Sequence, residues 1–184
     1  MKTSSLIFIC SVVTLLAGEQ QTSVTVTKET AFTFFRDYKR LTTKPYRVPL
    51  TLSGACTYSG TTTIQSGSLS IQPNPPAPGT YPHATPSIHV YVNSLADETI
   101  TQKRKVFPAG AVIVKEKLGD DGAVTGVGGM VKRAAGFDPK NGDWEYFYSD
   151  KASGFSIGRL QNCADCHGNV KETDYVFSVW KPFN

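Results

Sequence analysis

Between residues 88 and 149 the chain repeats one pattern, in which a short apolar run is followed by a turn. The runs have the length and the β-branched or aromatic composition of strands, and the turns carry Gly, Pro, Asn and Asp. Strands in such a succession pair as antiparallel neighbours. We therefore predict an α+β domain, a mainly antiparallel sheet with a few short helices and with strands over 88–92, 111–118, 125–133 and 144–149.

Two stretches carry helix signals. Apolar residues recur at helical spacing over 31–41, and Thr27 or Thr30 can cap a helix there. Ser94 followed by Asp97 resembles a capping box that opens a second, short helix.

The first 20 residues have the form of a secretory signal peptide. Lys2 precedes an apolar run over 6–16, and the small residues Ala17 and Gly18 follow it. This run is too short for a bilayer, which takes about 20 residues, and no later segment is apolar enough to cross one. We expect a periplasmic or otherwise exported protein without a membrane span after cleavage, with one domain over 21–184.

Composition excludes two other classes. Hydrophobic residues make up 40% and charged residues 18% of the chain, so it is not disordered as a whole. The net charge of +4 is mild and evenly spread, which argues against nucleic acid as a partner. The segment 54–86 is rich in Ser, Thr and Pro, and we predict an insertion or surface loop with a hairpin over 54–71.

The sequence Cys163-Ala164-Asp165-Cys166-His167 has the C-x-x-C-H spacing of a c-type haem attachment motif. Two thiols at this spacing reach the two vinyl groups of one porphyrin, and the next histidine becomes the iron ligand. Covalent haem attachment takes place outside the cytoplasm, in agreement with an export signal. We predict covalent haem c on Cys163 and Cys166, with His167 as the metal ligand in a helical turn over 163–170.

Alternatives to haem are weaker. A Cys163–Cys166 disulfide remains open, whereas a zinc site lacks a second ligand pair, since only Cys56, His83 and His89 remain. Cys56 is expected to be a free buried thiol, with an intermolecular bridge as the other possibility.

The sixth ligand of the iron is open. Met130, His83 and His89 are the residues that could supply it, and each suits a structural role better. A weakly filled sixth position points to chemistry on a small molecule.

Beyond the haem motif, the chain resembles the cytochrome P460 family and its relatives, the beta-class cytochromes c-prime. The resemblance spans roughly residues 85–180 and rests on stretches whose order and spacing match, namely His89–Asn93, Phe107–Glu116, Met130–Lys132, Gly136–Pro139, Gly142–Tyr146, Cys163–His167 and Asp174–Phe177.

The resemblance implies a mostly antiparallel β domain, often a homodimer, with one haem c. In the P460 members a lysine is also bonded to the porphyrin, and Lys115 matches that lysine. These members oxidise hydroxylamine to nitric oxide or nitrous oxide, and an external redox protein accepts the electrons. The c-prime relatives instead bind nitric oxide under an apolar cap.

The residues around Lys115 give independent support for its role at the haem. Ala111, Ile113 and Lys115 share one face of a strand whose two faces both begin apolar. A buried lysine needs a partner, which a bond to haem would supply. Otherwise the strand reaches solvent at this point, and Lys115, Glu116 and Lys117 are exposed.

One departure from the family matters. A carboxylate shortly before the haem motif would serve as general base in hydroxylamine oxidation, but the segment 151–162 has neither Asp nor Glu. Arg159 is a possible distal group in its place, and Phe107 and Phe155 could form an apolar cap. The sequence thus leaves three readings: a hydroxylamine oxidoreductase, a nitric oxide-binding cytochrome, and a simple electron-transfer cytochrome.

Overall fold

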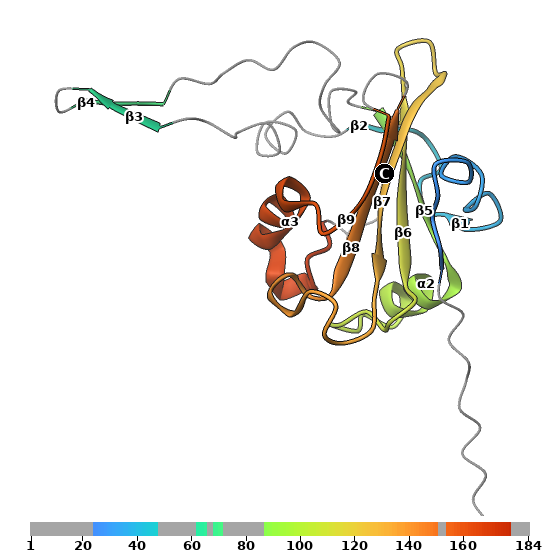
Figure 1. Ribbon diagram of the computed structural model, residues 1–184. Coiled ribbons are helices and arrows are strands. Elements are labelled where there is room, and N and C mark those ends of the chain that lie inside the picture. Colours follow the sequence, from blue (N-terminus) through green and yellow to red (C-terminus); the bar gives the residue numbers. More distant parts are fainter. Residues whose placement is uncertain (1–23, 48–61, 66–67, 72–86, 151–153, 178–184) are drawn as a thin grey trace, which may run out of the picture.

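The computed structural model describes residues 24–47, 62–65, 68–71, 87–150 and 154–177. Its main element is a seven-stranded antiparallel sheet in the order β1-β5-β6-β7-β8-β9, with β2 also paired to β5 (Figure 1). The mainly antiparallel α+β fold predicted from the sequence is confirmed. The strands are β1 (Lys39–Arg40), β2 (Tyr46–Arg47), β5 (Ser87–Val92), β6 (Val112–Leu118), β7 (Val124–Lys132), β8 (Trp144–Asp150) and β9 (Gly154–Gly158).

The strands from β5 to β9 form a meander, in which each pairs with the next along the chain. The four predicted strands are present, with bounds within two residues of those expected. Strand β9 was not predicted, because Phe155 and Ile157 are the only large apolar residues among its five. A separate two-stranded hairpin of β3 (Thr62–Gln65) and β4 (Ser68–Ile71) lies within the hairpin predicted over 54–71.

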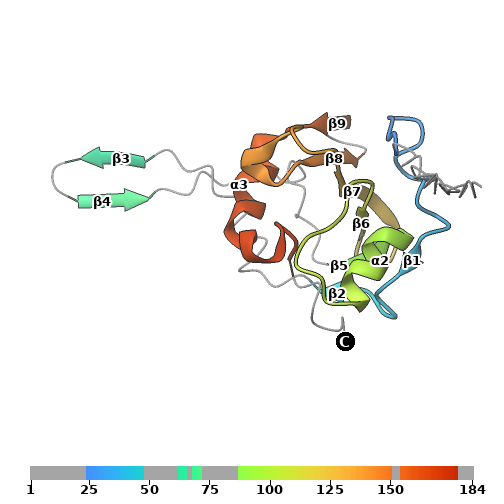
Figure 2. The same ribbon diagram turned by 90° about the horizontal axis from the view of Figure 1, so that it is seen from below.

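Alternation along each strand gives the sheet two buried faces. We call them the front face, which carries Ile113 and Tyr146, and the back face, which carries Val114 and Phe147. Helix α3 (Gln161–His167) packs on the front face through Ala164. Figures 1 and 2 show the N-terminal segment and α3 on opposite sides of the sheet.

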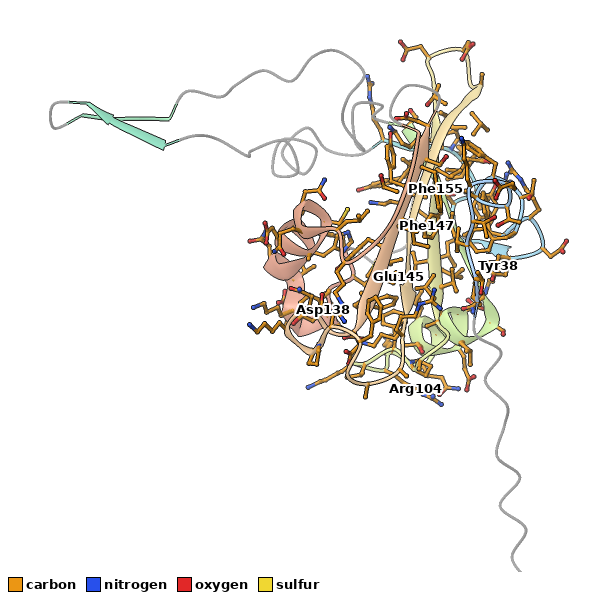
Figure 3. The ribbon with its side chains drawn as sticks, in the orientation of Figure 1. Tyr38, Arg104, Asp138, Glu145, Phe147 and Phe155 are labelled. Atoms are coloured by element: carbon orange, nitrogen blue, oxygen red, sulfur yellow. The ribbon has the colours of Figure 1, made fainter. Side chains whose placement is uncertain are left out.

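The N-terminal segment 28–37 is a series of turns and not the predicted helix. Its backbone hydrogen bonds differ in the number of residues they span. The Phe34 N–H bonds the oxygen four residues back, Thr30 O, while the Arg36 N–H bonds the oxygen three residues back, Thr33 O. Most of the predicted apolar residues face one way, because Ala31, Phe34, Phe35 and Tyr38 pack on the back face, but Leu41 packs against the front-face core. Its aromatic and β-branched composition gives little helix propensity to resist that packing. Figure 3 shows Tyr38 on this segment and Phe147 and Phe155 on the adjoining strands.

The second predicted helix is present as α2 (Ser94–Thr101), but its cap is Asn93 and not Ser94. The Asn93 side-chain oxygen accepts the backbone N–H of Ala96 at 3.1 Å and that of Val112 at 3.0 Å. Its amide nitrogen donates to Gly110 O at 2.8 Å. Asn93 therefore caps the helix and joins it to β6, which a serine could not do, since its hydroxyl is shorter and has one proton to donate.

Several predictions lie outside the described residues: the signal peptide over 1–20, the thiol of Cys56, His83, and most of the 54–86 insertion. Among the residues that the structure does describe, no helix has both the length and the apolar character needed to cross a membrane. The remaining elements are two 3-10 segments, η1 (Pro139–Asn141) and η2 (Gly168–Thr173).

Candidate functional site

Helix α3 carries the C-x-x-C-H motif. It begins after Leu160, whose carbonyl accepts the backbone N–H groups of Cys163 at 3.0 Å and Ala164 at 2.9 Å. Because residues three and four apart lie on one side of a helix, Cys163, Cys166 and His167 are neighbours on the surface of α3. Cys166 is buried, and Cys163 packs against the front-face core. The predicted helical turn is thus confirmed, in α3 and the η2 segment that continues it.

The His167 imidazole is fixed in one tautomer. Its Nδ1 atom lies 2.6 Å from the backbone oxygen of Tyr175. A carbonyl can only accept, so Nδ1 carries the proton and Nε2 keeps its lone pair for a ligand. Burial, reinforced by the positive charge of Lys115, lowers the pKa of His167 to about 3, although the bond to Tyr175 acts in the opposite direction. The ring is therefore neutral at physiological pH, as an iron ligand must be.

Aromatic rings surround this histidine. The His167 ring centroid lies 5.1 Å from that of Tyr146 on β8 and 5.2 Å from that of Phe177. The Tyr146 side chain is 2% exposed, and its hydroxyl has no hydrogen-bond partner within the described part of the chain. A buried hydroxyl without a partner is costly, so this atom fits a site at which a bound group supplies the missing partner.

The two thiols suit covalent attachment. No disulfide joins Cys163 to Cys166, so the alternative reading of the motif is not realised. Burial raises the pKa of the Cys163 thiol to about 11, against the opposing charge of Lys115. Haem c requires two thiols for attachment and an imidazole with a free Nε2 as the iron ligand, and α3 carries all three. The unsatisfied hydroxyl of Tyr146 lies on the ring next to that imidazole. The residues present fit that group.

Lys115 lies on the front face of β6, level with Val90 of β5 and Gly128 of β7. Its charge lowers the pKa values of both Cys163 and His167, which places its ammonium on the side of the sheet that faces α3.

The alternative in which β6 reaches solvent at Lys115 is wrong. Lys115 itself is partly buried, while Glu116 and Lys117 are only 4% and 6% exposed. Both faces of the strand are therefore covered, as its apolar composition predicted.

A second polar group lies on the same face. The Lys117 ammonium donates to the Tyr148 hydroxyl at 2.9 Å, and that hydroxyl donates to the Asp150 carboxylate. Burial lowers the pKa of Lys117, whereas the Asp150 charge opposes that shift. At the positions of β7 that separate these residues stand Gly126 and Gly128, which have no side chain, and the Lys117 ammonium reaches across β7 to Tyr148.

Other residues considered from the sequence lie elsewhere. Arg159 is exposed, and its guanidinium stacks 5.0 Å from the Phe137 ring centroid. Phe107 is buried in the front-face core. Phe155 packs on the back face, away from α3, so its predicted place in a cap over the haem is wrong. A distal role for Arg159 stays a prediction.

Neither described candidate for a sixth ligand is placed for that role by its contacts. Met130 is 4% exposed within the front-face core. His89 belongs to the opposite side of β5, where its Nδ1 bonds the Thr42 hydroxyl at 2.9 Å.

Sequence reasoning missed two functional groups, the Tyr146 hydroxyl and the Tyr175 carbonyl. Both residues stand in stretches that carry the family resemblance, Gly142–Tyr146 and Asp174–Phe177. That position was the available signal, but nothing in the sequence indicates a role for a backbone oxygen.

Two comparisons with known proteins bear on the family of this chain. A comparison with curated proteins finds no match. A family model described as Cytochrome P460 matches residues 70–178, which is more than half of the chain. The matched region holds strands β5 to β9, helix α3 and the turn that bonds His167. Members of this family bind haem, and the donor set on α3 suits it; the chain belongs to the cytochrome P460 family of haem-binding cytochromes.

Proposed function

We propose that this protein is an exported monohaem c-type cytochrome that acts on hydroxylamine or nitric oxide at the haem iron and passes electrons to an external acceptor. One observation carries the proposal: the His167 ring holds its Nδ1 proton on Tyr175 O, which leaves Nε2 for iron beside two thiols on the same helix. Export rests on the signal-peptide pattern of residues 1–20.

In this proposal Cys163 and Cys166 form thioether bonds to the porphyrin, and His167 is the proximal ligand. When bound, the haem supplies an iron that binds the substrate nitrogen and exchanges electrons with it. The chain would orient this group through α3, whose buried residue Ala164 anchors the helix on the front face.

Lys115 would modify the porphyrin by a covalent bond, as the resemblance implies. Its position supports this assignment, because the side chain is partly buried and its charge acts on both Cys163 and His167. In that bond the lysine nitrogen would replace a hydrogen of the porphyrin ring, which releases protons and passes two electrons to an external oxidant, and the ammonium charge would be lost.

Hydroxylamine oxidation releases protons, so an enzyme needs a group that receives them. The family's carboxylate before the haem motif has no counterpart in 151–162, but Asp150 stands immediately before that segment. Its carboxylate accepts a hydrogen bond from the Tyr148 hydroxyl on the front face. One strand, β7, separates these two residues from Lys115 and Lys117 on β6. We propose Asp150, through Tyr148, as the proton acceptor that oxidation of hydroxylamine would require.

The second candidate is a protein that binds nitric oxide without turnover, like the beta-class cytochromes c-prime. The observation that favours it is the apolar front face around α3, with Phe107 and Ile113 in the core. An apolar surround suits a neutral diatomic ligand better than a protonated substrate. A third candidate, a simple electron carrier, needs a sixth ligand to the iron. Met130 would have to leave the core to supply it, and His83 lies outside the described residues.

Partners follow from the chemistry. Oxidation of a nitrogen compound needs an electron-accepting redox protein, and the resemblance implies a homodimer. Both are part of the proposal.

The experiment is the absorption spectrum of the reduced protein, purified from a host that matures c-type haem, with intact mass as a check on attachment. A Soret band displaced far to the red supports a lysine-modified porphyrin and hydroxylamine turnover. An ordinary five-coordinate spectrum that shifts with nitric oxide supports the binding protein. A six-coordinate low-spin spectrum favours the electron carrier. A mass without covalent haem would overturn the proposal.

A further inference from the structure

We propose that the buried ion pair between Lys132 and Asp174 positions the proximal histidine. It does so by holding the turn whose next carbonyl, that of Tyr175, accepts the His167 Nδ1 proton. The inference rests on the proposed function, since it takes His167 as the iron ligand, and it assigns a role to residues that make no contact with the iron.

The ion pair is unusual in its burial. The Lys132 ammonium lies 2.7 Å from both oxygens of the Asp174 carboxylate, and the two side chains are 9% and 8% exposed. The ammonium also lies 5.0 Å from the Trp144 ring centroid. Removing two charges from water carries a large desolvation penalty, so such a pair is seldom a net source of stability. A role in fixing geometry explains its presence better.

The pair anchors a turn that needs support. Asp174 and Tyr175 have φ values of 52° and 66°, so two consecutive residues with side chains adopt the left-handed conformation. This conformation is unfavourable for a residue with a Cβ atom and persists when its surroundings hold it. The Asp174 carboxylate accepts the Phe107 N–H at 2.8 Å, and its carbonyl accepts the Trp144 indole N–H at 2.8 Å.

The turn at Asp174 and Tyr175 fixes the His167 ring. Asp174 is held from β7, β8 and the loop before β6, and the Tyr175 N–H bonds Val170 O at 3.0 Å, so the Tyr175 carbonyl is held between these contacts, 2.6 Å from His167 Nδ1. A short bond at Nδ1 makes Nε2 a stronger donor to a metal and sets the plane of the ring. A stronger donor stabilises ferric over ferrous iron and lowers the reduction potential.

The test uses Asp174→Asn holoprotein. Asparagine tolerates the left-handed backbone and still accepts the Phe107 N–H, so the substitution removes the charge and little else. We expect haem to remain attached, the iron–histidine stretching band in resonance Raman spectra to move to lower frequency, and the midpoint potential to rise. Lys132→Met, which keeps the carboxylate and removes its cation, should move both readouts in the same direction.

The matched control is Glu145→Gln. Arg133 comes directly after the last residue of β7, Lys132, and pairs with Glu145 on β8. The side chains of this pair are 20% and 15% exposed. This substitution breaks an ion pair at the same end of the sheet without touching the turn, so both readouts should stay at wild-type values. Wild-type values in Asp174→Asn and Lys132→Met would overturn the inference. So would loss of haem in both with a normal control, since a positioning role leaves haem attached.

Absence of covalent haem or of an iron–histidine band in the wild-type protein would be a different result. It would refute the proposed function itself, and so the two failures are distinguishable.

Discussion

Lys115 of β6 and Tyr148 of β8 are aligned across the sheet with only Gly128 of β7 between them. A side chain at this position would crowd the row, because a Cβ on Gly128 would lie 3.3 Å from the Tyr148 ring. Because Gly128 has no side chain, no β7 side chain stands between Lys115 and Tyr148 on the front face. Lys115, proposed to modify the haem, therefore lies across one strand from Tyr148, proposed to pass on the protons that hydroxylamine releases.

Lys115→Ala is expected to abolish any displaced Soret band while haem stays attached, because the thioethers of Cys163 and Cys166 do not depend on the lysine. The absorption spectrum of the reduced protein measures this. Lys117→Ala is the control, since Lys117 is the next residue on the same face of β6 and should leave the band in place. Persistence of the displaced band in Lys115→Ala would show that another residue modifies the ring.

Asp150→Asn is expected to lower kcat/KM for hydroxylamine about 100-fold, the usual contribution of one acid–base group. Nitric oxide binding should not change, because it requires no proton transfer. Steady-state turnover and a nitric oxide titration measure the two properties. Asp97→Asn is the control, since Asp97 bonds Lys39 at 2.8 Å on the surface of α2. Equal turnover in both variants would remove Asp150 from the proposed mechanism.

Cys163→Ala is expected to lose most of the holoprotein, because one thioether and its placement of the ring are gone. The yield of covalent haem, measured by mass and by the pyridine haemochrome spectrum, reports this. Asp165→Ala, a change inside the motif at an exposed position bonded to Gln161, should leave the yield unchanged. Normal haem incorporation in Cys163→Ala would refute the attachment site.

Tyr146→Phe is expected to act oppositely on the apoprotein and the holoprotein. In the apoprotein it removes a buried hydroxyl without a partner, which should raise the free energy of unfolding by about 1–3 kcal/mol. In the holoprotein the same hydroxyl has a partner, so the gain should vanish or reverse. Urea unfolding of both forms measures the difference.

Tyr91→Phe is the control for that experiment. The Tyr91 hydroxyl bonds Glu116 at 3.2 Å on the back face, so its loss should destabilise both forms alike. A Tyr146→Phe variant that gains equal stability in both forms would mean that the hydroxyl does not contact the haem.

The sheet could be read from the sequence because its signals are local. Each strand of the meander pairs with its neighbour in the chain, so apolar runs and turn residues between 88 and 149 define both the strands and their order. The N-terminal segment could not be read in the same way. Phe34, Phe35 and Tyr38 repeat at helical spacing, yet their conformation follows from packing on a back face that the sequence does not display.

The candidate site likewise has a part that the sequence predicts and a part that only the fold brings together. The spacing of Cys163, Cys166 and His167 is a local signal and predicts the attachment motif directly. The partners that tune it are distant in sequence: Lys132 and Asp174 are brought together only by the fold. Buried polar groups that meet across a sheet leave no periodic pattern, which is why their roles required the structure.

The opposite placement of the N-terminal segment and α3 has a consequence for the order of folding. Hairpins of the meander form from neighbouring contacts, and α3 follows β9 by two residues, so the front face can close early. The back face waits for β1 to reach β5, which joins Lys39 to Val92 and closes a loop of about 50 residues. A chain stalled before that step would present a wide apolar surface to chaperones and proteases, with its haem-binding side already assembled.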